Sequence, residues 1–107
     1  MLVKITPGKY KYNLASEDET SRQLSTSGGN EIIGVIVSAG NAPVAVRVVD
    51  TANGSAGYSR QDGFLVSAEA SNSFSPVITH PIPMKKGIYV IFEQGVGSNA
   101  ECFIWYN

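Results

Sequence analysis

From residue 30 onward, apolar side chains recur with the spacing of short β-strands. Residues 31–37 are β-branched and apolar on both faces, which is typical of a strand buried between two layers. In residues 42–50, valines alternate with side chains of the opposite face, and this period of two predicts a strand with one fully apolar face. Residues 38–41, between the two runs, include Gly and Asn, so we expect a hairpin-like loop there.

The C-terminal third has the strongest strand pattern. Residues 87–93 and 100–106 are apolar and aromatic runs on either side of a Gly-rich loop, which predicts a hairpin of antiparallel neighbours. In such a hairpin, Tyr89 and Trp105 would form a stabilising cross-strand pair. The side chains expected on a common face are Ile88, Val90 and Phe92 in the first run, and Cys102, Ile104 and Tyr106 in the second.

Weaker strand signals lie in the middle of the chain. Turn-forming residues precede a short strand predicted over residues 63–70, and residues 74–80 are a possible further strand. Pro81 and Pro83 exclude a central strand directly after it, because proline cannot donate a hydrogen bond to the ladder.

The segment 1–29 differs in character from the rest. Lys and Tyr alternate over residues 9–12, and a Ser- and Gly-rich stretch follows, so we interpret this segment as an edge strand or an arm joined by a hinge. The best helix candidate covers residues 15–24, where Ser16 and Glu19 have the spacing of a capping box. Leu24 is its one downstream apolar anchor, so this helix would have only one or two turns.

These signals together predict an all-β fold. We expect an antiparallel β-sandwich, jelly-roll-like, of six to eight short strands over residues 30–107, with residues 1–29 as an N-terminal arm or edge segment. A closed barrel remains an alternative, because the pattern does not separate the two.

Charge and cysteine content narrow the partners and the compartment. The formal net charge is −1 and the basic residues are scattered, so nucleic-acid binding has no electrostatic basis. No apolar stretch approaches a membrane span or the apolar region of a signal peptide, so we expect synthesis in the cytoplasm and no membrane partner. Cys102 is the one cysteine, which excludes an intrachain disulfide and favours a small buried apolar role.

The sequence gives little support for a catalytic function. His80 is the one conventional base at neutral pH, and it lies in a proline-rich corner without a G-x-S-x-G nucleophile elbow nearby. One His, one Cys and no paired acidic loop do not make a metal site. We therefore expect no enzyme activity, no metal and no cofactor, and loss of turnover in His80→Ala would contradict this.

Aromatic side chains are the candidates for binding. Tyr and Trp anchor many protein interfaces, and we take Tyr10, Tyr12 and Tyr58 as the candidate interface residues. Solvent-facing aromatics on one sheet face would instead favour sugar binding.

The segment from Glu31 to Tyr106 resembles small β-sandwich virion proteins of tailed bacteriophages. The likeness is one of pattern over about two-thirds of the chain, and the segment 1–29 has no counterpart in it. It is carried by the apolar strand Ile32–Val37, the Val-rich strand ending at Asp50, Phe74-Ser75-Pro76, Pro81-Ile82-Pro83-Met84, Lys86 to Val90 and the aromatic terminal strand ending at Tyr106.

The resemblance implies a function in the virion. Such proteins decorate and cement the capsid, or serve as accessory subunits of the head or tail. It implies a homo-oligomer that binds the major capsid protein or other virion subunits, with sheet edges, the N-terminal arm and loop tips as contact surfaces. The alternative function is a carbohydrate- or receptor-binding β module of a phage tail or fibre.

Overall fold

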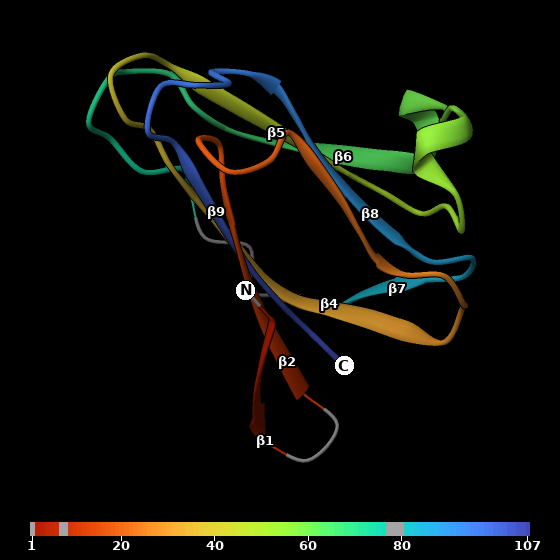
Figure 1. Cartoon of the computed structure of the whole chain (residues 1–107). Coiled ribbons are helices and arrows are strands. Elements are labelled where there is room, and N and C mark those ends of the chain that lie inside the picture. Colours follow the sequence, from red (N-terminus) through yellow and green to blue (C-terminus); the bar gives the residue numbers. More distant parts are fainter. Residues whose placement is uncertain (1, 7–8, 77–80) are drawn as a thin grey trace.

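The computed structural model describes residues 2–6, 9–76 and 81–107, with side chains from residue 12 onward. Within these residues the chain forms short strands, two 3₁₀ turns and no α-helix (Figure 1). The strands are β1 (Leu2–Thr6), β2 (Lys9–Ala15), β3 (Ser21–Ser25), β4 (Asn30–Ser38), β5 (Val44–Val49), β6 (Gly63–Ala68), β7 (Ile82–Met84), β8 (Ile88–Gln94) and β9 (Glu101–Tyr106). The 3₁₀ turns are η1 (Gly54–Ala56) and η2 (Arg60–Asp62), both between β5 and β6.

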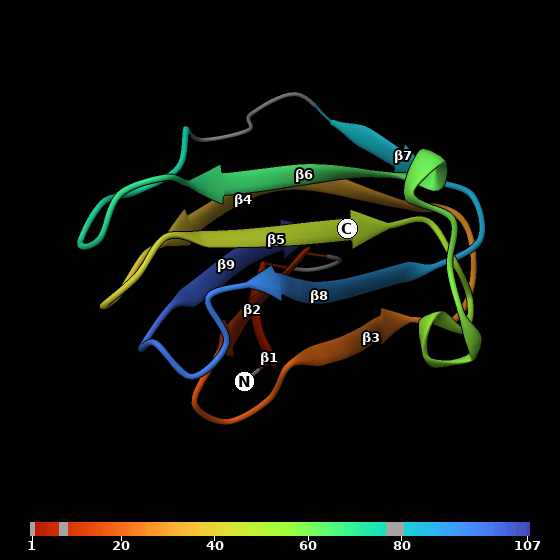
Figure 2. The ribbon, with the colours of Figure 1, turned by 90° about the horizontal axis from the view of Figure 1, so that it is seen from above.

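The strands build two antiparallel sheets packed face to face (Figures 1 and 2). Strands β2 to β9 form two four-stranded sheets with the orders β2-β9-β4-β7 and β3-β8-β5-β6, and β1 extends the first sheet at its β2 edge. From β2 onward the chain alternates between the sheets, apart from the β5–β6 hairpin, and this connectivity is a jelly roll. The predicted antiparallel β-sandwich is confirmed.

The sequence predicts that residues 38–41 and residues 94–99 each connect a hairpin, and both predictions are wrong. β4 and β5 lie in different sheets, and so do β8 and β9. The C-terminal strand is instead central in its sheet, because β9 pairs with β2 and β4. An apolar strand gains most when it is hydrogen-bonded on both edges and covered on one face, and a terminal hairpin would leave an edge open. The expected Tyr89–Trp105 pair is wrong for the same reason.

The core lies between the sheets and follows the predicted faces. The alternating valines of β5, the even-numbered apolar residues of β8 and those of β9 all point inward, and Cys102 is fully buried among them. The inward side chains with no exposed surface include Leu14, Ile32, Val35, Val46, Val48, Ile88, Val90, Cys102 and Ile104. Burial of this kind contributes about 25 cal/mol per Å² of apolar surface, so these inner faces stabilise the fold more than any other contact.

The segment 1–29 contributes strands to both sheets. β2 pairs with β9 from Tyr10 to Ala15 and buries Leu14 completely, and β3 forms an edge strand on β8. The helix candidate over residues 15–24 does not form, because Ser16 bonds across to Ala100 instead of capping a helix: its hydroxyl accepts from the Ala100 N–H at 2.9 Å. The division at residue 29 stays a prediction, but strands from both of its sides share each sheet.

The proline-bounded segment ends the five-stranded sheet. β7 has three residues, contains Pro83 and pairs, among the described strands, with β4 alone, so proline lies on an edge strand as expected. Of the possible strand over residues 74–80, the structure shows a single bridge between Phe74 and Ser38, and residues 77–80 lie outside the described part. Within the described residues, no helix is long and apolar enough to cross a membrane.

Candidate functional site

Four loops meet at one end of the sandwich, on the left of Figure 2. They cover residues 16–20, 39–43, 69–76 and 95–100, and we name this set the loop end. Because strands alternate between sheets, every second connection returns to this end, and segments distant in the sequence lie side by side there. Loops carried on a rigid sandwich are where binding residues concentrate.

Backbone hydrogen bonds join these loops to one another. The Asn41 N–H donates to the Ser98 carbonyl at 2.7 Å, and the Ala39 N–H donates to the Ser73 carbonyl at 2.8 Å. The Glu17 carboxylate accepts from the Asn99 N–H at 2.7 Å and ties the first loop to the last. The loop end is therefore ordered before any partner arrives, which lowers the entropy lost on binding.

Gly40 lies at the closest approach between two of these loops. A Cβ atom at this position would lie 1.9 Å from the Ser98 carbonyl oxygen and 2.7 Å from the backbone of Asn99. Only glycine allows the backbones to approach this closely.

The loop end presents exposed apolar side chains. Phe74 is 66% exposed and Val96 is 50% exposed. The other large apolar side chain with comparable exposure in the described residues is Leu65 of β6, at 48%. Large exposed apolar groups held on ordered backbone are typical of contact surfaces, whereas exposure alone is common. Sequence reasoning missed Phe74 and Val96, and the Gly and Pro residues around them were their only signal.

Tyr12 and Tyr58, two of the three predicted interface tyrosines, do not belong to the loop end. The side chain of Tyr10 lies outside the described residues. Tyr12 is 5% exposed, its hydroxyl donates to the Glu19 carboxylate, and the Arg22 guanidinium lies 5.5 Å from its ring centre. Burial and the Glu19 carboxylate raise the pKa of Tyr12 to about 12, so the phenol stays neutral. Tyr12 therefore packs in the core beside the contacts to β3 and has little surface left for a partner.

Tyr58 lies at the other end of the sandwich, in the long connection between β5 and β6. Its ring centre is 5.8 Å from that of Tyr89, and it is half-buried against the outer face of the four-stranded sheet. Tyr58 therefore helps to hold this connection on the sheet and has limited surface left for a partner.

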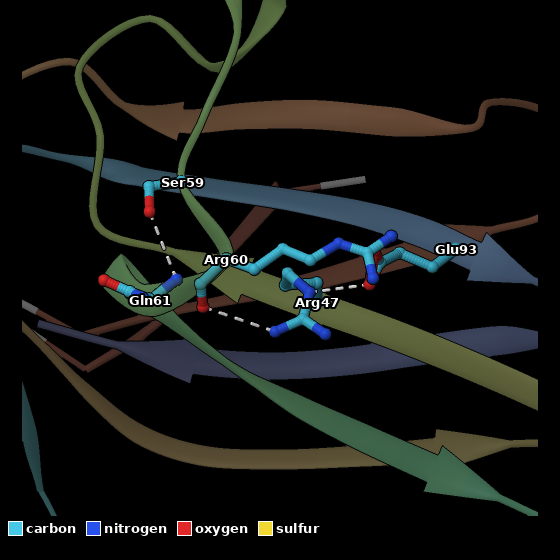
Figure 3. A network of polar contacts seen from close by, with 5 residues as sticks. All are labelled: Arg47, Ser59, Arg60, Gln61 and Glu93. Carbon is cyan, nitrogen blue, oxygen red and sulfur yellow. Dashed lines mark hydrogen bonds and ion pairs between the residues drawn. The ribbon is translucent and has the colours of Figure 1, made fainter.

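An ionic network on the same face fixes the second 3₁₀ turn (Figure 3). Glu93 pairs with Arg47 at 2.6 Å and with Arg60 at 3.0 Å, and Arg47 also donates to the Arg60 carbonyl at 3.5 Å. Arg47 and Glu93 are each 13% exposed, whereas Arg60 is 73% exposed. The network binds η2 to β5 and β8, and this structural role accounts for its charges.

A polar groove of about 570 Å³ runs between β3 and the first 3₁₀ turn. Its walls include Arg22 and Gln23 on one side and Asn53 and Ser55 on the other, and Tyr89 also lines it. Gln23 makes this wall rigid, because its side-chain amide bonds to the Thr51 carbonyl at 2.7 Å and to the Gly54 N–H at 2.8 Å. This volume lies within the roughly 300–1,000 Å³ range of small-molecule sites.

Reactive groups are few in the described part of the chain. It contains no cluster of three or more His, Cys, Asp or Glu side chains that could hold a metal. Burial raises the pKa of the Cys102 thiol to about 12, so it remains protonated and apolar in the core. His80 lies outside the described residues. A search of protein-family models and of curated proteins found no match to this chain.

Proposed function

We propose that this protein is a non-enzymatic structural component of a phage virion, a decoration protein that binds and reinforces the head lattice. The observation that carries the proposal is the loop end, where interlocked loops present Phe74 and Val96 to solvent. The jelly roll is compatible with this role because it occurs in viral capsid domains, although a fold by itself does not set a function. The phage-like pattern of residues 31–106 points the same way.

The mechanism follows from repetition. A decoration protein binds many identical sites on the capsid lattice, so a modest affinity at each site suffices for stable coverage. Ordered loops suit this task because little conformational freedom is lost at each contact. In this role the protein joins the major capsid protein or another virion subunit and resides in the virion after synthesis in the host cytoplasm.

The test is co-sedimentation with assembled heads of the capsid protein encoded in the same genome. The wild-type chain should pellet with heads at a saturating ratio, and a Phe74→Ala/Val96→Ala double variant should bind at least about tenfold more weakly. Lys85→Ser is the matched control, because Lys85 is exposed at the other end of the sandwich. Failure of the wild-type chain to pellet, or equal pelleting of the double variant, would contradict the proposal.

The polar groove favours a second candidate, a carbohydrate- or receptor-binding module of a tail or fibre. Its hydrogen-bonding walls and its volume suit a short polyhydroxylated ligand. A glycan array distinguishes the two functions. Saturable binding that is lost in Asn53→Ala would support the module, and binding to heads alone would exclude it.

A further inference from the structure

In the described part of the chain the two sheets have four edge strands, and these are not equally protected. β1 and β7 end the five-stranded sheet, and β3 and β6 end the four-stranded sheet. An edge strand offers unpaired backbone N–H and C=O groups to other chains, so natural proteins protect it with bulges, prolines, charges or short length.

Three of the four edges carry such protection. The pairing of β1 shifts register between Lys4 and Thr6, and that of β3 shifts between Gln23 and Ser25. β3 also carries the charged Arg22. β7 has only three residues and contains Pro83.

β6 lacks every one of these devices. It is six residues long, with the sequence GFLVSA, and contains neither proline nor a charged residue. Its pairing with β5 continues without a register shift from Val44↔Ala68 to Val49↔Gly63. Figure 2 shows it as the outermost strand of its sheet, and among the described strands only β5 pairs with it. An uncharged edge without a bulge can accept another strand.

We propose that β6 pairs with β6 of a second copy of this chain, antiparallel and about a twofold axis, to join two four-stranded sheets into one of eight strands. Residues opposite each other in an antiparallel pair point to the same face, so the axis must pass through a residue of β6. Placing it at Leu65 sets Leu65 against its own copy on the outer face. Phe64 then opposes Val66 of the second copy on the inner face.

This register fits the burial of the strand. Leu65 is 48% exposed in the single chain, whereas Val66 is 4% exposed and Phe64 already packs against the core. A Leu65–Leu65 contact would cover the exposed leucine, and an uncharged strand meets its copy without repulsion between like charges. An isologous contact of this kind closes after two copies and does not propagate into a filament.

The test uses the purified full chain without capsids, so its result is separate from that of the virion proposal. In sedimentation equilibrium the wild-type chain should show twice the 11.4 kDa chain mass. Leu65→Lys sets two ammonium groups opposite each other and should raise the dissociation constant by more than about tenfold. Ser27→Lys places the same charge on an exposed residue that follows β3, the opposite edge of the same sheet, and should leave the dimer intact.

Hydrogen exchange gives a measurement that does not depend on how well a variant folds. Amides of residues 64–67 in the wild-type chain should become more protected as its concentration rises, while those of the 95–99 loop stay constant. The proposal would be overturned if the wild-type chain were monomeric or if the Leu65→Lys variant dimerised as tightly as wild type. Amide exchange at β6 that does not change with protein concentration would overturn it too.

Discussion

The two ends of the sandwich hold their loops by different means. At the loop end, backbone groups join one loop to the next, as between Asn41 and Ser98, and the side chains of Ser16 and Glu17 add bonds to the last loop. At the opposite end, which we name the far end (residues 26–29, 50–62 and 85–87), three side chains bind the loops beside backbone bonds such as that from the Asp50 N–H to the Asp62 carbonyl. These side chains are Gln23, Asp50 and Glu93.

This difference sets which residues are free to change. Where the backbone holds the loops, most side chains can vary without loss of structure, and they can be used for a partner. Where side chains hold the loops, each of these side chains is constrained. The comparison thus favours the loop end as a binding surface and the far end as structural support.

Loss of Gln23 should have the largest effect on stability. Its amide bonds to the Thr51 and Ile88 carbonyls and to the Gly54 N–H, so Gln23→Ala leaves several partly buried backbone groups without partners. We expect a loss of about 3 kcal/mol in the free energy of unfolding, measured by urea denaturation. Ser71→Ala is the control, because its exposed hydroxyl donates to the Asn41 carbonyl at the loop end. Equal losses in both variants would remove the distinction between the two ends.

Gly40 tests the backbone contacts of the loop end directly. In Gly40→Ala the new methyl group would overlap the Ser98 carbonyl, so the loops must separate, at a cost of about 2 kcal/mol. Asn41→Ala is the matched control, since Asn41 is exposed and its bond to Ser98 uses the backbone. If urea denaturation gives the two variants the same stability, the loops do not pack as described.

Asp50 makes the far end sensitive to pH. Partial burial raises the pKa of its carboxyl group, but the N–H groups of Lys85, Lys86 and Gly87 and the Lys86 charge outweigh burial, and the net pKa lies below the usual 3.8. The ionised carboxylate of Asp50 is therefore the form that accepts these hydrogen bonds. Its contribution to stability is complete above the ordinary pKa and is lost as the pH falls through the lowered value.

Asp50→Asn should accordingly cost about 1.5 kcal/mol at neutral pH and little in strong acid, where the wild-type carboxyl is protonated too. Urea denaturation at both pH values measures this convergence. Asp62→Asn is the control, because Asp62 is exposed in the same loop system. A difference between wild type and Asp50→Asn that persists unchanged in acid would assign the effect to something other than charge.

The strands and their inner faces could be predicted because period-two patterns are local. The alternating valines of β5 and the even-numbered residues of β8 show which face is buried without knowledge of their neighbours. Strand pairing could not be predicted in the same way. The apolar pattern of β8 is compatible with a hairpin and with a jelly roll. Which of the two forms depends on the pairing of β2 and β3, whose strand pattern in the sequence is weak.

The site was less predictable than the fold. Tyr12 has an aromatic side chain of the type found at interfaces, but it lies opposite Ile104 on the inner face of its sheet and belongs to the core, so its burial depends on strand pairing. Phe74 shows the opposite outcome, because it is exposed. Nothing in the local sequence distinguishes it from a core aromatic residue, and its exposure follows from its place at the end of the sandwich. Exposure depends on tertiary structure at both positions, so composition and spacing cannot supply it.

Phe74 gives the smallest expected effect on stability and the sharpest test of the comparison. Its ring is 66% exposed, and its link to the sheet is a backbone bridge with Ser38 that alanine retains. Phe74→Ala should change the free energy of unfolding by less than about 0.5 kcal/mol, because little buried surface is lost. Gly40→Ala, at the same end, should cost several times more.

A neutral result for Phe74→Ala has a consequence for function. A large aromatic group that adds nothing to stability and stays in water is unfavourable for solubility, so its presence favours an external partner. Urea denaturation of Phe74→Ala beside Gly40→Ala measures the contrast within one end of the molecule. If Phe74→Ala instead costs as much as Gly40→Ala, the ring supports the loops, and the loop end is then held by side chains, as the far end is.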